Sequence, residues 1–386
     1  MKIGYFSHSS ISPSETFIYD LFKGLQNKGL AITYYCGKVS DKNCFIDSTQ
    51  YIGYAEEGLR NSLFAYKVGQ ITGGNGYKYK NKVQQYYSIK ALNKKILNKP
   101  DVAYVDYATS AVLLVDYFKE NNIPFVVHVH GYDITSATID PVYSRKLQKV
   151  FEEACFIIAA SHYIRKLLVL LGCESDKIRV IRYGIDVNSI TPLSWSDRKK
   201  LDPNVIFLGR LTAKKHPLAL LQAFKIVKDK VPQSKLTIIG DGELKSLVQH
   251  RIKALGLISS VNMLGVLNRE QSFPILNQHW VYAQHSVTAN SGDQEGFAIS
   301  LAEAAAHELP VVSTLHNGIP ENVLDKETGF LVKEFDYEAM ADRIIDLLRN
   351  PDLAEEMGKA GRKHIAELCN PQLRVNKIND LLHQVR

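Results

Sequence analysis

Two acidic residues enclose a short run of small and apolar residues in the second half of the chain, Glu295-Gly-Phe-Ala-Ile-Ser-Leu-Ala-Glu303. The run 298–306 predicts a packed helix that starts near Phe297, which puts Glu295 in front of its N-terminus. Glu303 then lies about two turns inside, at ~3.6 residues per turn. The first N–H groups of a helix lack internal partners and carry partial positive charge, so they suit a phosphate. With two carboxylates they fit a phosphorylated ligand that carries hydroxyls, such as a nucleotide sugar, although a buried helix with two incidental surface acids explains the spacing equally well.

Two cations stand at a predicted strand–helix junction upstream of this run. The run 205–208 predicts a strand, Gly209 and Arg210 follow it, and Lys215 comes five residues later near the start of a helix. Fixed cations at such a junction can clamp a diphosphate, and an arginine can do so through two parallel hydrogen bonds. Taken alone, one arginine and one lysine in a loop would be ordinary surface charge.

Strand-like apolar runs alternate with helix-like segments along the whole chain. Strands are predicted at 2–7, 31–35, 102–106, 125–130, 155–159, 178–181, 205–208, 236–239, 261–264, 281–284, 311–313 and 330–332. Helices are predicted at 15–28, 111–120, 142–153, 161–171, 218–230, 242–255, 268–276, 297–307 and 337–348. This alternation favours parallel sheets covered by helices on both faces. Because the 386 residues exceed what one core usually holds and contain two such series, we expect two Rossmann-like domains, 1–184 and 185–370.

The notable residues of the second half follow successive strands. They are Gly209-Arg210, Gly240-Asp241-Gly242, the loop that ends at Glu295, and the turn 314–321. Parallel sheets of this kind bind ligands beyond the carboxyl ends of their strands, so these four loops are expected on one rim. Gly318, in the last of them, is interpreted as permitting close approach of the backbone to a ligand.

Composition excludes several other classes of protein. The chain is 45% hydrophobic and 23% charged, without a low-complexity tract or a run of ~18 apolar residues that could span a membrane. Residues 1–6 enter a strand-like run at once and lack the apolar stretch of a signal peptide, which predicts a cytoplasmic protein. Five widely spread cysteines form no C-x-x-C pair, so neither a disulfide framework nor a zinc site is indicated.

The net charge of +7 is concentrated in one window, Arg60–Lys99. This basic window holds Arg60 and eight lysines, no Asp or Glu, and several interleaved aromatic residues. Such a surface would be drawn to an anionic partner such as lipid headgroups, an acidic glycan or nucleic acid. A solvated basic helix face accounts for it equally well.

Taken together, these motifs resemble those of a known family. Glu295 to Glu303 matches the E-G-F-x₅-E signature of retaining glycosyltransferases of the GT-B fold, the large family 4 group. The segments Gly209-Arg-Leu, Lys215, Gly240-Asp-Gly242, Gly265, Gly318-Ile-Pro-Glu321 and Gly329-Phe-Leu-Val332 follow that group's pattern in the expected order. Ser14-Glu-Thr-Phe-Ile18 and His130-Gly-Tyr-Asp133 are similar to the bacterial colanic-acid and exopolysaccharide enzymes. The resemblance covers essentially the whole chain.

The resemblance implies a role for each matching residue. Arg210 and Lys215 would bind the donor diphosphate, with Gly209 and Asp241 on the same donor-binding rim. Glu295, with the backbone of Gly296 and Phe297, would hold the donor sugar, and Glu303 would hold the ribose hydroxyls. His130 would lie close to the sugar and phosphate on the acceptor domain, where Ser14, Glu15 and Thr16 replace the glycine-rich first loop of many relatives. Residues 371–386 would pack back onto the first domain.

Two further positions depart from the family's pattern. His216 and Asn317 stand where relatives often have glycine, which puts the backbone geometry at both places in question. The chain also holds no Asp-x-Asp motif, so we expect neither a metal ion nor another cofactor. Arg210, Lys215 and the helix N-terminus would then neutralise the charge that a divalent ion would otherwise carry.

The resemblance thus implies a retaining, metal-independent transferase with parallel sheets facing across a cleft. It would take a sugar from a nucleotide diphosphate sugar, with UDP favoured over GDP, to a glycan or lipid-linked glycan acceptor at the inner face of the membrane. Attachment to that surface would be peripheral, and no nucleic-acid partner is expected. A glycan phosphorylase would need a pyridoxal-phosphate lysine, for which there is no motif. A non-catalytic nucleotide-sugar-binding partner within a polysaccharide assembly complex is the remaining alternative.

Overall fold

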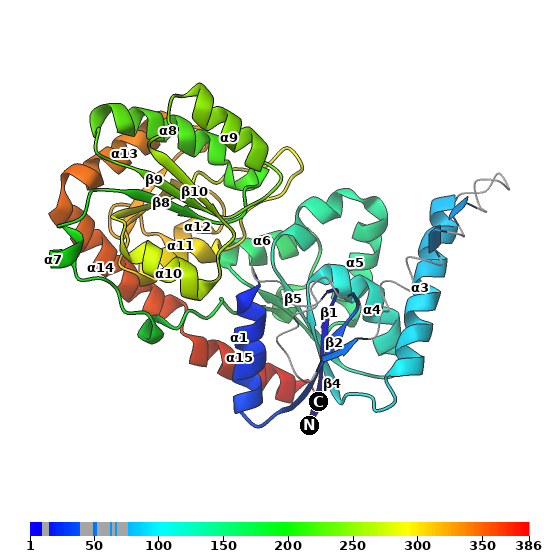
Figure 1. Ribbon diagram of the computed structural model, residues 1–386. Coiled ribbons are helices and arrows are strands. Elements are labelled where there is room, and N and C mark those ends of the chain that lie inside the picture. The colour runs from blue at the N-terminus through cyan, green and yellow to red at the C-terminus, as the bar shows by residue number, and fades with distance from the viewer. Residues whose placement is uncertain (10–14, 39–48, 52–61, 64–65, 68–75, 386) are drawn as a thin grey trace. The chain divides into compact units, whose positions relative to one another are not determined.

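The computed structural model describes residues 1–9, 15–38, 49–51, 62–63, 66–67 and 76–385. The chain forms two compact units. The first contains Met1–Gly184 and Gln372–Arg386, and the second contains Ile185–Pro371. Each unit is a parallel sheet with helices on both faces (Figure 1). No helix among the described residues combines the length and the apolar character needed to cross a membrane.

The sheet of the first unit has seven described strands in the order β3-β2-β1-β4-β5-β6-β7. They are β1 (Lys2–Ser7), β2 (Ala31–Cys36), β3 (Thr49–Tyr51), β4 (Val102–Asp106), β5 (Phe125–Val129), β6 (Phe156–Ala159) and β7 (Ile178–Val180). All neighbouring pairs are parallel. Helices cover both faces, so the central strands β4 and β5 are buried along their whole length, which explains why they read as continuous apolar runs.

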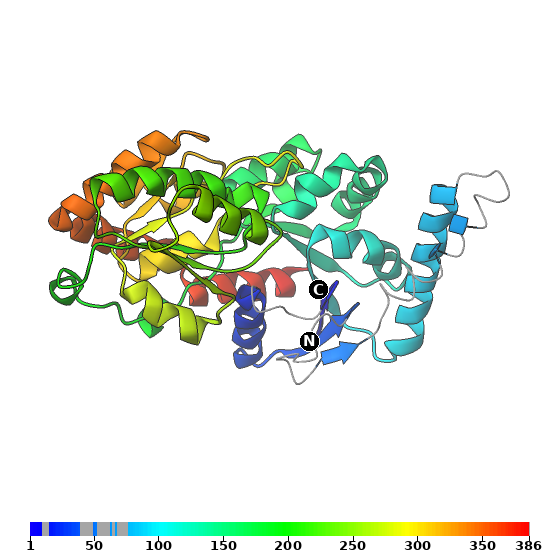
Figure 2. The same ribbon diagram turned by 45° about the horizontal axis from the view of Figure 1, so that its top comes forward.

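The longer helices of the first unit are α1 (Thr16–Asn27), α3 (Gly76–Lys95), α4 (Ala108–Glu120), α5 (Pro141–Glu153), α6 (His162–Leu170) and α15 (Pro371–Gln384). Although α1 and α15 lie far apart in sequence, α15 crosses α1 in both views (Figures 1 and 2). The buried Arg374 of α15 donates from Nη1 to the backbone oxygen of Phe17, at 2.9 Å. Val375 packs so closely on Gly24 that an added Cβ there would lie 2.5 Å from its Cγ2. The segment after the second unit therefore completes the core of the first.

The second unit repeats the same order with six strands, β10-β9-β8-β11-β12-β13. They are β8 (Val205–Leu208), β9 (Leu236–Ile239), β10 (Val261–Gly265), β11 (Val281–Ala283), β12 (Val311–Thr314) and β13 (Gly329–Val332). The main helices are α8 (Pro217–Lys230), α9 (Lys245–Ala254), α10 (Arg269–Asn277), α11 (Ile299–Ala306), α13 (Tyr337–Arg349) and α14 (Pro351–Leu368). One core layer packs β8, β9 and β11 against α8 and α13, and a second packs the other face against α10 and α11.

The structure confirms the α/β class with two Rossmann-like units and differs from the sequence prediction in a few elements. Helix α11 begins at Ile299 rather than near Phe297, because Ala298 adopts a left-handed conformation with φ 53°. Glu303 is therefore the fifth residue of the helix, a little more than one turn inside it. Helix α9 begins at Lys245 rather than at Gly242, and α14, α3 and β3 were not predicted.

Both sheets share one topological feature that places a ligand site. In the first unit β1 lies between β2 and β4, and in the second β8 lies between β9 and β11. The connections from these central strands run to opposite sides, which leaves a crevice at the carboxyl ends of β1 and β4, and of β8 and β11. The residues that follow these four strands are thus the first candidates for a functional site in each unit.

Candidate functional site

A buried ion pair occupies the crevice of the second unit. Lys215 is the last residue of the short turn 213–215 after β8, and Glu295 lies near the end of the long loop between β11 and α11. Nζ of Lys215 lies 2.9 Å from Oε1 of Glu295, with side chains only 12% and 8% exposed. Because β8 and β11 are neighbours in the sheet, two residues eighty positions apart meet where the strand order reverses.

The charges of this pair are strongly coupled. Burial by itself would raise the pKa of the Glu295 carboxyl, but the ammonium groups of Lys215 and Lys214 outweigh it and lower the pKa to about 2. Burial also lowers the pKa of Lys215, and Glu295 offsets only part of that effect. The carboxylate of Glu295 is therefore ionised at neutral pH and depends on its cations for that state.

A polar network at the end of β11 holds Lys215 from a second side. The Oε1 atom of Gln284, a fully buried side chain, accepts from Nζ of Lys215 at 3.1 Å. The Tyr282 hydroxyl donates to the Leu208 backbone oxygen at 2.9 Å and lies 3.1 Å from the same Gln284 oxygen. Sequence analysis did not identify Gln284 as a site residue. Gln284 could have been recognised because its amide directly follows a buried strand, and a buried polar group there needs a hydrogen-bond partner.

Glu303 also has a cationic partner that the sequence did not indicate. Nε of Arg269, the first residue of α10, lies 3.2 Å from Oε1 of Glu303. Glu303 is 9% exposed and Arg269 is partly exposed at the edge of the same rim. The structure therefore pairs each of the two acids of the Glu295–Glu303 motif with a base.

The remaining donor-side residues lie on the same rim but differ in their contacts. Arg210 is exposed and lies close enough to Lys215 for its charge to lower the pKa of that ammonium. The Asp241 carboxylate is used locally: it accepts from the Gly242 backbone N–H at 2.7 Å and pairs with Lys245 at 2.6 Å. Gly296 and Phe297 are buried between Glu295 and α11.

Glycines let the rim loops touch backbone to backbone. A Cβ added at Gly318 would lie 1.9 Å from the Gly296 backbone oxygen, and one added at Gly240 would lie 1.9 Å from that of Gly209. Gly318 was interpreted from the sequence as allowing approach to a ligand, but its close partner is the neighbouring loop. The four loops after β8, β9, β11 and β12 thus form two directly stacked pairs.

The two positions where glycine was expected keep a glycine-like backbone. His216 has φ 38° and Asn317 has φ 48°, both in the left-handed region. Asparagine tolerates this region better than most residues. At His216 the side chain stabilises the left-handed backbone, because Nδ1 accepts from the Ala219 backbone N–H at 3.0 Å and caps α8.

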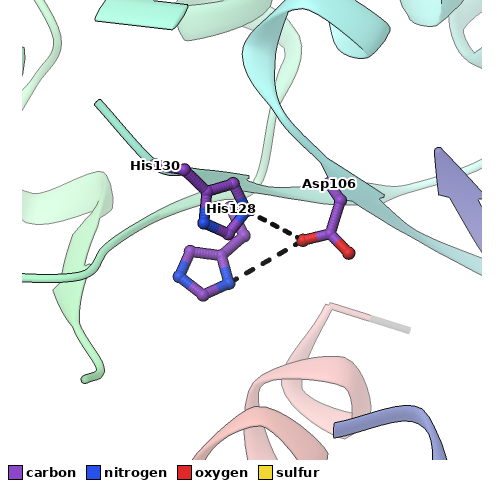
Figure 3. Close-up of side chains that lie close together, drawn as sticks. All are labelled: Asp106, His128 and His130. Atoms are coloured by element: carbon purple, nitrogen blue, oxygen red, sulfur yellow. Dashed lines mark hydrogen bonds and ion pairs between the residues drawn. The ribbon is translucent and has the colours of Figure 1, made fainter. Parts of the chain in front are cut away.

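In the first unit, a histidine pair and an aspartate form a buried cluster (Figure 3). Nε2 of His130 lies 3.0 Å from Oδ1 of Asp106, and Nδ1 of His128 lies 4.0 Å from the same oxygen. The Tyr5 hydroxyl donates to the other carboxylate oxygen. On its far side, Nδ1 of His130 lies 2.6 Å from the Tyr183 hydroxyl. Both ring nitrogens of His130 are therefore held within the unit.

Two imidazoles and a carboxylate at this spacing are also a possible set of ligands for an ion such as Zn²⁺. Hydrogen bonds already engage the same atoms: Nδ1 of His128 lies 2.7 Å from the Tyr104 hydroxyl, and Asp106 has His130 and Tyr5 as partners. Burial, with the nearby His130 and Arg374, holds the pKa of His128 well below its usual range. The cluster therefore reads as a hydrogen-bonded support for His130, and the expectation of no metal remains a prediction.

Tyr107 links this cluster to the start of α1 and was not predicted. Its hydroxyl donates to Oε1 of Glu15 at 2.9 Å, and its ring centroid lies 4.3 Å from that of His130. Tyr107 has φ 65° and ψ 132°, a costly backbone conformation for a tyrosine. Thr16 is the first residue of α1, and Ser14 lies outside the described residues.

Much of the basic window Arg60–Lys99 also lies outside the described residues, including Arg60 and the side chains of the lysines at 78, 80 and 82. The described part contains α3 and the turn that follows it. The described positions 62–63 and 66–67 also belong to the window, and its exposed lysines are Lys67, Lys90, Lys94, Lys95 and Lys99. Lys90 lies 6.0 Å from the ring centroid of the exposed Tyr86.

Comparison with known families matches both units. Residues 14–189 match the sequence model described as Glycosyltransferase Family 4, and residues 194–364 match the one described as Glycosyl transferases group 1. Among curated proteins, the chain is 29% identical over 257 residues to a putative colanic acid biosynthesis glycosyltransferase, WcaL, of Salmonella typhimurium. It is 27% identical over 256 residues to the amylovoran biosynthesis glycosyltransferase AmsK of Erwinia amylovora. Each match covers 66% of this chain and 63% of the relative, so the chain spans less than two thirds of their length.

Solved structures extend the likeness over the full chain. The structure of HepE from Anabaena in complex with UDP and glucose covers all of both chains with a TM-score of 0.77 at 18% identity. Sucrose-phosphate synthase from Thermosynechococcus elongatus has a TM-score of 0.74 at 18% identity, covering 100% of this chain and 98% of that one. At this level of identity the likeness concerns the fold.

Proposed function

This chain belongs to the glycosyltransferases of family 4 and group 1 and has their GT-B fold, and on that premise we propose that it moves a sugar from a nucleotide diphosphate sugar to a glycan or lipid-linked glycan. The second unit binds the donor and the first binds the acceptor. The observation that carries the proposal is the buried pair of Lys215 and Glu295 at the switch point of the second sheet. We propose a UDP-sugar rather than a GDP-sugar, as the resemblance implies, and HepE was solved with UDP and with UDP-glucose. The colanic acid and amylovoran relatives support a role in surface polysaccharide biosynthesis.

The donor diphosphate gains negative charge as its bond to the sugar breaks. Groups that are already oriented toward this charge stabilise the transition state more than the bound donor, which is what lowers a barrier. Lys215 and Arg210 are the cations in reach, and the N-terminus of α11 adds partial positive charge. No divalent ion is required in this arrangement.

Glu295 and Glu303 bind two different parts of the donor, the transferred sugar and the ribose. Glu295 holds the donor sugar together with the backbone of Gly296 and Phe297, and its carboxylate accepts hydrogen bonds from the sugar hydroxyls. Glu303, kept in place by Arg269, accepts from the ribose hydroxyls. No side chain on the second unit's rim is an evident covalent nucleophile. The family resemblance favours retention by attack on the same face, with the leaving phosphate taking the acceptor's proton.

The resemblance implies a role for His130 of the first unit at the donor sugar and phosphate, and we propose that role for it. Asp106 and Tyr183 hold its ring, and Tyr107 links it to Glu15. The loop of Ser14, Glu15 and Thr16 then meets the acceptor. We propose peripheral attachment to an anionic membrane surface through the basic window, which would bring a lipid-linked acceptor to this unit.

The paired acids supply the main test. Glu303→Gln should mainly weaken binding of UDP, because ribose contacts are the same in the ground and transition states. Glu295→Gln should mainly slow transfer, because contacts at the reacting sugar differ between the two states. A thermal-shift screen of UDP- and GDP-sugars identifies the donor first, since a ligand that binds only the native protein raises its melting temperature. If both variants bind and turn over like wild type, the assignment is wrong.

A second test concerns the cations and metal independence. Arg210→Ala should reduce turnover at least a hundredfold, because losing one oriented donor at a developing charge costs on the order of 3 kcal/mol. Lys225→Ala is the control, since that partly exposed lysine of α8 pairs locally, with Asp229, away from the rim. A chelator should leave the wild-type rate unchanged. Full dependence on added Mg²⁺ or Mn²⁺ would refute the metal-free mechanism, and donor binding without transfer or hydrolysis would favour a non-catalytic binding partner.

A further inference from the structure

One buried histidine on the donor rim has contacts that the proposed function does not use. His316 follows β12 and is 1% exposed. Its Nδ1 lies 2.6 Å from Oε1 of Glu334, just beyond β13. Its Nε2 accepts from the backbone N–H of Glu295 at 3.3 Å and lies 2.9 Å from Nδ2 of Asn317. The imidazole thus stands between a carboxylate and the residue that pairs with Lys215.

These contacts fix the tautomer of the ring. A backbone N–H can only donate, so Nε2 of His316 must be unprotonated to receive the Glu295 N–H. The ring proton is therefore on Nδ1, where it is donated to Glu334. The Asn317 amide is oriented as this tautomer requires. Its Nδ2 donates to Oε1 of Gln294 at 2.9 Å, so the same NH₂ group is the one that faces the unprotonated Nε2 of His316.

Glu334 anchors more than the histidine. Its second oxygen, Oε2, accepts from the Thr288 backbone N–H at 3.0 Å. One carboxylate therefore ties the start of the loop after β11 to the loop after β12, and His316 carries the connection on to the end of the β11 loop at Glu295. The stacked backbones of Gly318 and Gly296 leave that loop little freedom to compensate if the connection is lost.

We propose that His316 is a positioning residue for Glu295, and that Glu334 selects the tautomer that makes this possible. The inference rests on the proposed role of Glu295 at the donor sugar. His316 does not touch the donor: it sets where the Glu295 backbone lies, and so where the carboxylate meets both Lys215 and the sugar hydroxyls. Loss of the acceptor atom should therefore reduce the rate of transfer while leaving the affinity for UDP, which lacks the sugar, unchanged.

Two substitutions separate the two ring nitrogens. The amide of His316→Gln reaches the position of Nε2, so its oxygen can still accept from the Glu295 N–H. The shorter amide of His316→Asn reaches only the position of Nδ1, so it can still donate to Glu334 but leaves the Glu295 N–H without an acceptor. We expect His316→Asn to lower kcat at least tenfold with the Kd of UDP within twofold of wild type, and His316→Gln to restore most of the rate.

A control histidine in the same unit distinguishes positioning from general destabilisation. His279 is also buried between two partners, the Ile275 backbone oxygen and Thr237 Oγ1, but at the end of α10. Its Asn and Gln variants should lower the melting temperature without the difference in kcat that separates the two His316 variants. Equal kcat in His316→Asn and His316→Gln would overturn the inference.

A readout that needs no turnover keeps the inference testable if the donor is misassigned. Amide hydrogen exchange at Glu295, measured on the full chain without ligand, should be faster in His316→Asn than in wild type and close to wild type in His316→Gln. Unchanged exchange in both variants overturns the positioning role. Wild-type protein that neither transfers nor hydrolyses UDP-glucose or any other nucleotide sugar counts against the proposed function, while faster exchange in His316→Asn still supports the contact.

Discussion

Neutralising Lys215 should destabilise the second unit through the carboxylate that it leaves behind. Lys215→Met removes the ammonium and keeps most of the apolar stem. In the wild type the pKa of Glu295 falls from its ordinary value of 4.5 to about 2, which at ~1.36 kcal/mol per unit corresponds to about 3 kcal/mol for the ionised form. This figure agrees with the ~3–5 kcal/mol typical of breaking a buried pair from one side. Burial lowers the pKa of Lys215, which means that burying the charged lysine is unfavourable. The net contribution of the pair to the free energy of folding is therefore smaller than the figure for Glu295 alone.

A double-mutant cycle isolates the interaction. Glu295→Gln should cost less than Lys215→Met, because a buried lysine whose pKa is already lowered can shed its proton. The double variant carries no charge at either position, and we expect a coupling energy of about 2–3 kcal/mol between the two sites. Additivity within ~0.5 kcal/mol would mean that the pair contributes nothing and would refute the reasoning.

The direction in which stability changes with pH tests the assigned charge of Glu295. A carboxylate whose pKa is lower in the folded state stabilises the protein above its unfolded pKa, near 4.5, and that stabilisation is lost as the pH falls toward 2. In Lys215→Met we expect burial to outweigh the remaining charge of Lys214 and to raise the pKa of Glu295, so that the carboxyl can be buried in its neutral form at acid pH. The deficit of the variant relative to wild type should therefore shrink as the pH is lowered from 7 to about 4.

Urea unfolding followed by tryptophan fluorescence suits this measurement. Both tryptophans of the chain, Trp195 and Trp280, lie in the core of the second unit with ring centroids 6.1 Å apart. The signal therefore reports on the unit that contains the pair, which matters because a chain of two units need not unfold in one step. A deficit that stays constant or grows between pH 7 and 4 would contradict the assigned role of Glu295.

Three further outcomes can be checked. Gly318→Ala should lower both the melting temperature and the transfer rate, because its Cβ would lie 1.9 Å from the Gly296 oxygen. Gly361→Ala in α14 is the control, because its Cβ would make only ordinary contact, 3.5 Å from the Cβ of Ala305. A wild-type rate in Gly318→Ala would show that the rim loops can separate. Asp106→Asn should reduce transfer more than UDP affinity, because it weakens the support of His130, and an unchanged rate would leave the cluster without a role in catalysis. Reversing the charge of Lys94, Lys95 and Lys99 should release the protein from anionic liposomes at low salt, since each cation near such a surface contributes up to ~1 kcal/mol. Equal sedimentation with neutral and anionic liposomes would show that the basic window is only a solvated helix face.

The sequence predicted the sheets well because their burial on both faces leaves continuous apolar runs. It missed α14 although Met357, Gly361 and Ile365 recur at helical spacing on its buried side and Asn350 caps its start, so that signal was present. The late start of α11 could not be predicted, because the left-handed Ala298 lies in a loop shaped by the contact of Gly296 with Gly318.

Among the site residues too, the sequence indicated some, and others could be found only from tertiary contacts. The motif indicated Lys215 and Glu295 as members of one site, but their direct pairing depends on which strands are neighbours. Arg269, Gln284, His316 and Tyr107 were missed because each acts through a partner brought in by the fold, at separations of 34, 69, 21 and 92 residues. A family pattern marks residues that meet the ligand and says little about those that hold them.

The packing of α15 against α1 has a consequence for the order in which the protein matures. Residues are added from the N-terminus onward, so the second unit is synthesised before Arg374 and Val375 can reach Phe17 and Gly24. Until then the first unit carries an uncovered apolar surface on α1, whereas the second can fold as soon as it leaves the ribosome. We therefore expect the unit made first to be completed last, and a released chain truncated after residue 370 to be protected from protease in its second unit but not in its first.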